Sequence, residues 1–397
     1  MMAAAVDMVG PLSFTPDAIL SAAIERTGLR DFGDPSFRAP LEALLAAIEE
    51  SAELSAFGRV SIGMFLVQLA VNRLRLEDLI ARHPEILEIV IAAPIVIAGL
   101  QRTGTTHLHN LLSADPELRH LPYWESLEPV PVQGEPGGDA DPRRGRCASA
   151  LAFQGEVMPY FERMHEMTVD HAHEEIHLLA MDFSTMLFDA VMHVPEWRRF
   201  YLSRDQRPHY AYLKRVLQAL TWLRGGARWV LKSPQHIEQL PALMATFPDA
   251  TVVLTHRDPL AVIASTATMV AYGMRMSRER IDLAAVGETW VGNTEQMLRA
   301  CLRDRAAVPA VQSMDVSFHD YMRDDIAVAA AIYARAGQPL GERSRAAIDE
   351  YRRTHPRGRF GRVEYDLADF GLHTGELRER FRFYTDTFDL GGESPAA

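Results

Sequence analysis

The chain has 397 residues, of which 48% are hydrophobic and 24% charged, and its formal net charge is −12. This composition is typical of a globular protein with a large core, and the acidic balance excludes a general nucleic-acid surface. The two cysteines exclude a disulfide framework and favour a reducing compartment, so we expect a cytoplasmic protein.

Neither the first residues nor the longest apolar run of the sequence indicates a membrane protein. The first ten residues contain an aspartate and no lysine or arginine, which is not typical of a secretory signal peptide. The longest apolar run, Ile89 to Leu100, is shorter than the ~20 residues that a membrane helix needs. We therefore expect that the chain is not an integral membrane protein.

The first ninety residues have the periodicity of helices. Leu41, Leu44, Leu45 and Ile48 follow helical spacing after Pro40, which is a favourable residue for a first turn. The pattern changes at residues 95–98, a short continuous apolar run that ends at a glycine. Such a run predicts a buried parallel strand.

Further strands alternate with helices in the second half of the chain. Trp229 to Leu231 and Thr251 to Leu254 are short apolar runs before helical patterns, and a weaker strand is expected from Val311 to Phe318. This alternation predicts an α/β fold, a P-loop-type parallel sheet flanked by helices. We expect a helical N-terminal region (1–93), an α/β core (94–135 and 225–397) and a helical insertion on the acceptor side (136–224).

A glycine-containing loop, GLQRTGTT, joins the first strand to a helix. Its spacing matches the phosphate-binding pattern G-x-x-x-x-G-K-[ST], but Thr105 replaces the lysine and the basic residue is Arg102. Backbone N–H groups at such a helix start bind anions. The candidate phosphate ligands are Gln101, Arg102, Thr103, Gly104, Thr105 and Thr106.

This loop resembles the 5′-phosphosulfate loop of sulfotransferases that use 3′-phosphoadenosine 5′-phosphosulfate, in particular the bacterial branch of that family. The segment THRDPLAVIAS places Arg257 and Ser265 where the family binds the 3′-phosphate. The late basic segment HPRGRFGR adds Arg357, Gly358 and Arg359, and Phe318 lies where the family often has a tyrosine near adenine. The resemblance implies this donor, the product adenosine 3′,5′-bisphosphate, and no metal.

The same resemblance indicates the catalytic side chains. Lys232 ends the second core strand, where the family's lysine bridges the sulfate and the leaving oxygen. His236 follows on the first turn of the next helix, whose positive end favours a neutral ring that can act as a general base. Glu125 is the alternative base, because some branches use a glutamate after the first helix. We favour His236.

Two other functions match parts of the sequence. The segment HEEIH, His173 to His177, matches a zinc-protease pattern, but Ala180 and Phe183 replace the glycine and the third histidine of its extended form. A nucleotide-binding scaffold without catalysis is a further alternative, and the presence of Lys232 argues against it.

The acceptor is not encoded in any motif. Methionines and aromatic residues of the insertion could form an adaptable apolar cavity, or ordinary helical core: Met158, Phe161, Met164, Met167, Met181, Phe183, Met186 and Phe188. We expect a hydroxyl of a hydrophobic small molecule or lipid to receive the sulfuryl group by in-line attack. A homodimer is possible, and the sequence does not decide the oligomeric state.

Overall fold

A single parallel sheet forms the centre of the protein. The computed structural model describes residues 13–51, 53–226, 228–356, 359–361 and 363–390. Within this part the sheet has five strands in the order β2–β3–β1–β4–β5, and all neighbouring pairs are parallel. The strands are β1 (Ile95–Gly99), β2 (Leu118–Arg119), β3 (Arg228–Lys232), β4 (Thr251–His256) and β5 (Ser313–Ser317).

The register of the three central strands brings their carboxyl ends to one edge. Ile97 on β1 lies opposite Lys232 on β3, and Gly99 lies opposite Thr255 on β4. A Cβ on Gly99 would lie 2.0 Å from the side-chain oxygen of Thr255, so only glycine fits at this strand end. In an open parallel sheet, this edge is where ligands bind.

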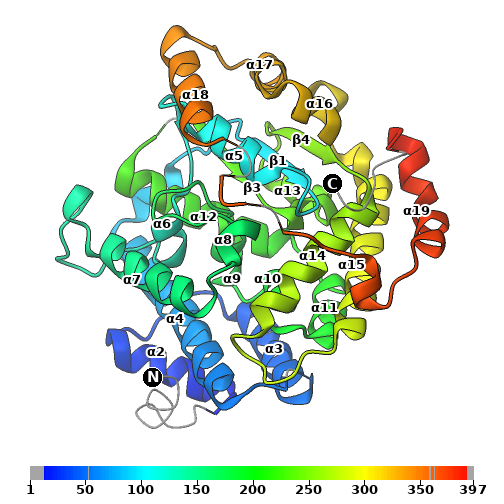
Figure 1. The fold of residues 1–397 in the computed structure, drawn as a ribbon. Coiled ribbons are helices and arrows are strands. Elements are labelled where there is room, and N and C mark those ends of the chain that lie inside the picture. Colours follow the sequence, from blue (N-terminus) through cyan, green and yellow to red (C-terminus); the bar gives the residue numbers. More distant parts are fainter. Residues whose placement is uncertain (1–12, 52, 227, 357–358, 362, 391–397) are drawn as a thin grey trace.

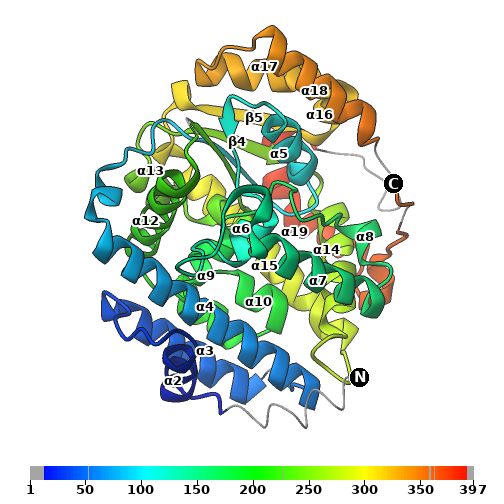
Figure 2. The same ribbon diagram turned by 90° about the vertical axis from the view of Figure 1, so that its left-hand side faces the viewer.

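The two faces of the sheet belong to separate parts of the core, because successive strand residues point to opposite sides. Ile95 and Ile97 pack with α5 (Thr105–Ser113), α17 (Asp325–Ala336) and α18 (Glu342–Thr354). Val96 and Ala98 belong to the larger cluster with α12 (Arg207–Arg224), α13 (Leu240–Thr246), α14 (Pro259–Met274) and α15 (Leu283–Asp304). Figures 1 and 2 show α17 and α18 on one side of the sheet and the larger helical body on the other.

Of the N-terminal residues that the structure describes, most lie in three helices at the far end of that body (Figures 1 and 2). These are α2 (Pro16–Thr27), α3 (Arg38–Ser51) and α4 (Ala56–Arg82). Arg73 on α4 forms a buried ion pair with Asp182 of the insertion. The N-terminal helices are therefore docked on the insertion by charge as well as by apolar packing.

The segment between β2 and β3 is helical but repeatedly interrupted. The sequence predicts a helical insertion over residues 136–224, whereas the structure has mostly short helices joined by turns. Proline explains several of the breaks, since Pro195 and Pro208 lie in the first turns of new helices. The helices are α6 (Tyr123–Leu127), α7 (Pro142–Val157), α8 (Phe161–Met164), α9 (Ile176–Ala180), α10 (Leu187–Met192), α11 (Pro195–Leu202) and α12.

The predicted α/β fold with a P-loop-type parallel sheet is confirmed. The two-residue strand β2 was not predicted, and α16 (Phe318–Arg323) and α19 (Thr374–Phe388) complete the fold. The boundaries proposed for the three regions of the chain stay predictions. No helix in the described part of the chain is both long and apolar enough to cross a bilayer.

Candidate active site

The predicted phosphate loop lies between β1 and α5 in the conformation of an anion-binding turn. Gly104 has φ of 82° and caps α5, and a Cβ there would lie 3.3–3.4 Å from the rings of Tyr321 and Phe318. Arg102 has φ of 68°, which is costly for a residue with a side chain. Strain of this kind is concentrated at functional sites.

Three predicted donor-binding residues meet around the loop. The Nε of Arg102 donates a hydrogen bond to the Ser265 hydroxyl at 2.8 Å, and Arg257 donates to the Arg102 carbonyl at 2.8 Å. The Arg257 guanidinium lies 4.0 Å from the centre of the Phe318 ring. These contacts join the end of β4 and α14 to the loop through Arg102. That Arg257 and Ser265 bind one phosphate stays a prediction.

The charge of Arg102 is not neutralised within the described chain. Its hydrogen bonds go to the Ser265 hydroxyl and the Met164 carbonyl, and no carboxylate of the described residues pairs with it. Burial lowers the pKa of Arg102, and the positive charge of Arg257 lowers it further. A half-buried cation beside a second cation is stabilised by a bound anion.

A cavity of about 610 Å³ opens beside these arginines. Seven of the predicted donor-binding residues line it: Arg102, Gly104, Thr105, Thr106, Arg257, Phe318 and Arg359. Its opposite wall comes from the insertion and includes His165, Glu166 and His171. Arg359 forms an ion pair with Glu166, so the late basic segment and the insertion meet across the cavity. The predicted residues Arg357 and Gly358 lie outside the described residues.

Two other predicted loop residues do not line this cavity. The Thr103 hydroxyl lies 2.8 Å from that of Thr255 and donates to the Leu100 carbonyl, which ties the loop to β1 and β4. The buried amide of Gln101 has no hydrogen-bond partner among the described residues.

Lys232 lies at the end of β3 beneath the loop, with 2% of its side chain exposed. Its Nζ donates to the Thr106 hydroxyl at 3.4 Å and pairs with the Glu174 carboxylate. Its backbone N–H donates to Glu175 at 2.9 Å. Two adjacent glutamates therefore bind this lysine, one at its backbone and one at its tip.

His236 lies behind Lys232 and does not line the cavity. It belongs to a short 3₁₀ turn, Pro234–Glu238, and is completely buried. Its Nε2 contacts Glu175 and its Nδ1 accepts from or donates to the Tyr210 hydroxyl at 2.8 Å. Since both ring nitrogens are engaged, the structure does not bring His236 to the cavity where an acceptor would lie.

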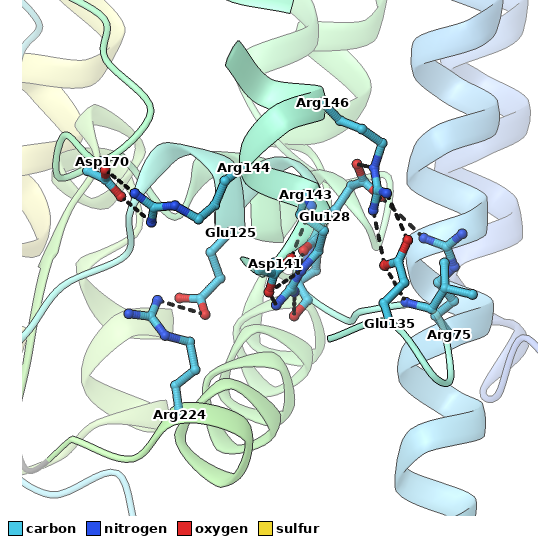
Figure 3. Close-up of polar contacts among 12 residues, drawn as sticks. Arg75, Glu125, Glu128, Glu135, Asp141, Arg143, Arg144, Arg146, Asp170 and Arg224 are labelled. Atoms are coloured by element: carbon cyan, nitrogen blue, oxygen red, sulfur yellow. Dashed lines mark hydrogen bonds and ion pairs between the residues drawn. The ribbon is translucent and has the colours of Figure 1, made fainter. Parts of the chain in front are cut away.

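Glu125 is also completely buried, on α6. One carboxylate oxygen pairs with Arg119 at 2.5 Å. The other pairs with Arg224 at 3.1 Å (Figure 3). These contacts join α6 to β2 and to the end of α12. Glu125 does not line the cavity, so the structure brings neither predicted base into it.

The HEEIH segment does not have the arrangement of a zinc site. Nε2 of His173 and Nδ1 of His177 lie 2.8 Å apart, a hydrogen-bond distance. Two nitrogens bound at about 2.0–2.1 Å to one tetrahedral zinc would lie about 3.3 Å apart. No group of three suitable side chains among the residues that the structure describes could hold a metal ion.

Most of the methionines and aromatic residues noted in the insertion lie in the core. Met181, Phe183 and Phe188 are fully buried, and Met186 is nearly so. Of the full set, Met164 lines the cavity. The cavity wall is instead rich in histidine and charged side chains, because the polar turn residues between α8 and α9 face it.

Comparisons with known proteins agree with this geometry. Residues 94–342 match the sequence profile of the sulfotransferase family. The chain belongs to the sulfotransferase family. The fold is similar to that of sulfotransferase STF1 from Mycobacterium tuberculosis H37Rv, with 30% identity, a TM-score of 0.82, and coverage of 94% of this chain and 99% of that one. It is also similar to sulfotransferase STF9 from Mycobacterium avium, with 27% identity, a TM-score of 0.84, and coverage of 97% and 98%. Among curated proteins, no sequence gives a significant match.

Sequence reasoning missed three residues that contact Lys232 or His236 in this sulfotransferase. Glu174 and Glu175 were read only as part of a zinc motif, and Tyr210 carried no motif at all. The signal that could have found the glutamates is their charge, since a buried lysine at a strand end requires carboxylates nearby.

Proposed function

We propose that this protein transfers a sulfuryl group from 3′-phosphoadenosine 5′-phosphosulfate to a hydroxyl of a small-molecule acceptor. The observation that supports the proposal best is the pair of arginines at the cavity, Arg102 and Arg257. Arg102 has no carboxylate partner in the described chain, and it hydrogen-bonds Ser265, the serine expected at the 3′-phosphate. A ligand with two separate anionic groups fits this arrangement.

The donor supplies an activated sulfuryl group, and the side chains of the chain position and stabilise it. Arg257, Ser265 and Arg359 would hold the 3′-phosphate, and the backbone N–H groups of residues 104–106 would bind the 5′ group. Lys232 would donate to the oxygen that leaves with the phosphate, where negative charge grows during transfer. Fixed donors of this kind act mainly on the transition state.

The cavity wall bears on the acceptor class. A hydrophobic or lipid acceptor was expected from methionines and aromatic residues, most of which are in the core. The wall presents His120, His165, His171 and Asp170 instead. We therefore propose a polar hydroxylated small molecule. The cytoplasmic location and a homodimer stay predictions.

The proposal is tested by the affinity for adenosine 3′,5′-bisphosphate. Arg257→Ala should weaken its binding by about 1.5–3 kcal/mol, the range for a charge-assisted hydrogen bond, and should weaken adenosine 5′-phosphate binding much less. Calorimetry measures both, and the exposed Arg30→Ala is a matched control that should change neither. Equal losses for the two ligands would remove Arg257 from the 3′ site.

The competing function is a nucleotide-binding scaffold without catalysis. It predicts bisphosphate binding without any sulfated product. Mass spectrometry of a library of hydroxylated metabolites incubated with the donor distinguishes the two, because a sulfuryl transfer adds a fixed mass to the acceptor. Binding with no product from a broad library would favour the scaffold.

A further inference from the structure

Helix α19 lies outside the segment that matches the sulfotransferase profile. The match covers residues 94–342, whereas α19 spans Thr374–Phe388. The helix packs along α14 and α15 through a face that includes the buried residues Leu377, Phe381 and Tyr384 (Figure 1). None of its residues, all of which the structure describes, lines the cavity of the candidate active site. Any role of α19 in that site is therefore indirect.

Two side chains of α19 contact the two neighbours of Arg257 in the chain. On one side, the Tyr384 hydroxyl lies 2.6 Å from Nδ1 of His256, the last residue of β4. On the other side, Arg378 donates a hydrogen bond to the carboxylate of Asp258. Both contacted side chains are buried. Arg257 is thus the middle residue of a segment that α19 holds at both ends.

The ring of His256 is bound at both of its nitrogens. Its Nε2 lies 2.8 Å from the Asp315 carboxylate on β5, and because a carboxylate only accepts, Nε2 is the donor. Nδ1 of the neutral ring then accepts the hydrogen of the Tyr384 hydroxyl. Phe388, at the end of α19, stacks on the same ring with the two centres 3.8 Å apart. These contacts fix the end of β4 against α19.

The carboxylate of Asp258 has two different partners. One oxygen accepts from the backbone N–H of Leu260 and caps α14, and the other pairs with Arg378. Only 1% of the Asp258 side chain is exposed, and the residue directly follows Arg257. Without Arg378, this buried negative charge would stay next to Arg257 and compete with a phosphate for its guanidinium.

We propose that Arg378 and Tyr384 are positioning residues for the anion site at Arg257, and this inference rests on the proposed function. Arg378 neutralises Asp258, so the charge of Arg257 stays available to a phosphate. Tyr384 holds His256, so the backbone that carries Arg257 keeps its place at the end of β4. The helix beyond the family match therefore sets the affinity for the 3′-phosphate without touching the ligand.

The test compares two ligands that differ only in the 3′-phosphate. Arg378→Gln should weaken the binding of adenosine 3′,5′-bisphosphate on the order of 2- to 30-fold, the range for residues that act through a neighbour, and should change adenosine 5′-phosphate binding much less. Calorimetry measures both affinities. Arg378→Lys keeps a cation near Asp258 and should restore most of the bisphosphate affinity. Arg382→Gln, on the exposed side of the same helix, is the matched control and should change neither affinity.

A second variant makes the test independent of the ion pair. Tyr384→Phe removes one hydroxyl group from the contact with His256 and should show the same selective loss, and urea unfolding shows whether each variant is folded. A purely structural role of α19 would lower the free energy of unfolding and leave the ratio of the two affinities unchanged, which would overturn the proposal. Absence of any bisphosphate binding by the wild type would instead contradict the proposed function, and this inference with it.

Discussion

Two networks of ion pairs in this protein differ in how far water reaches them. Arg73 and Asp182 have 1% and 3% of their side chains exposed, and His209 contacts the same carboxylate. Arg144 and Asp170, which join α7 to the cavity wall, have 34% and 58% exposed (Figure 3). The first network joins α4 to two parts of the insertion, the turn after α9 and helix α12. The second network holds one helix, α7, at the surface.

The difference in exposure implies a difference in function. Removing one member of a buried pair leaves a charge without solvent, whereas an exposed partner is rehydrated at once. Helix α7 has two buried residues, Arg143 and Cys147. We infer that the buried network fixes the frame behind the site, and that the surface network only restrains a lightly packed helix beside it.

The largest effect on the free energy of unfolding is expected from a substitution of Asp182. Asp182→Ala leaves Arg73 buried without its carboxylate, so the free energy of unfolding should fall by about 3–5 kcal/mol. Urea unfolding followed by circular dichroism measures this loss. Arg73→Met with Asp182→Leu should recover much of it, since an apolar pair leaves no buried charge. A loss below about 1 kcal/mol for Asp182→Ala would mean that water compensates the buried network as well.

An intermediate effect on folding stability is expected when the pH decreases, from histidines such as His177 that have no carboxylate partner. Burial lowers the pKa of His177 to about 4, whereas an unfolded histidine titrates near 6.5. The unfolded state therefore binds the extra proton first, and stability should fall as the pH decreases from about 6.5 to about 4.

The variant His177→Gln isolates this contribution. The difference in unfolding free energy between pH 7 and pH 4 should be smaller than in the wild type by on the order of 1–3 kcal/mol. Denaturant titrations at the two pH values give both differences. The same acid loss in variant and wild type would show that His177 is protonated equally in both states.

The smallest effect is expected on α7. Arg146 pairs with Glu128 and Glu135 on the surface, with 41% of its side chain exposed (Figure 3). Arg146→Ala should therefore cost about 0.2–1 kcal/mol, and 1 M salt should remove most of the difference by screening. Thermal unfolding at low and high salt measures it. A loss that persists in salt would place this network with the buried one.

The sequence predicted the parts of the fold that depend on neighbouring residues. The apolar run that ends at Gly99 and the helix that begins after the glycine-containing loop are local patterns, and each lies where it was expected. Strand β2 was missed because two residues are too few for a periodicity.

The candidate site was predicted less completely, because its geometry depends on distant segments. Most of the loop, Arg257 and Phe318 line one cavity, and their role in binding a donor stays a prediction. The direction of His236 is set by Glu175 and Tyr210, which are 61 and 26 residues away. Glu125 is held by Arg224, 99 residues further along. Spacing within a motif contains no information on such partners, so both predicted bases stay untested.

The backbone conformation of Arg102 lowers the stability of the fold, while its side chain favours the binding of an anion. Its φ of 68° is a conformation that glycine adopts freely and arginine does not. Selection for heat resistance alone would favour glycine at this position, because glycine removes both the backbone strain and the half-buried charge. Under the proposed function, arginine at 102 is thus a trade-off in which the unliganded protein is less stable than its fold allows, and an anion bound there would restore the lost stability.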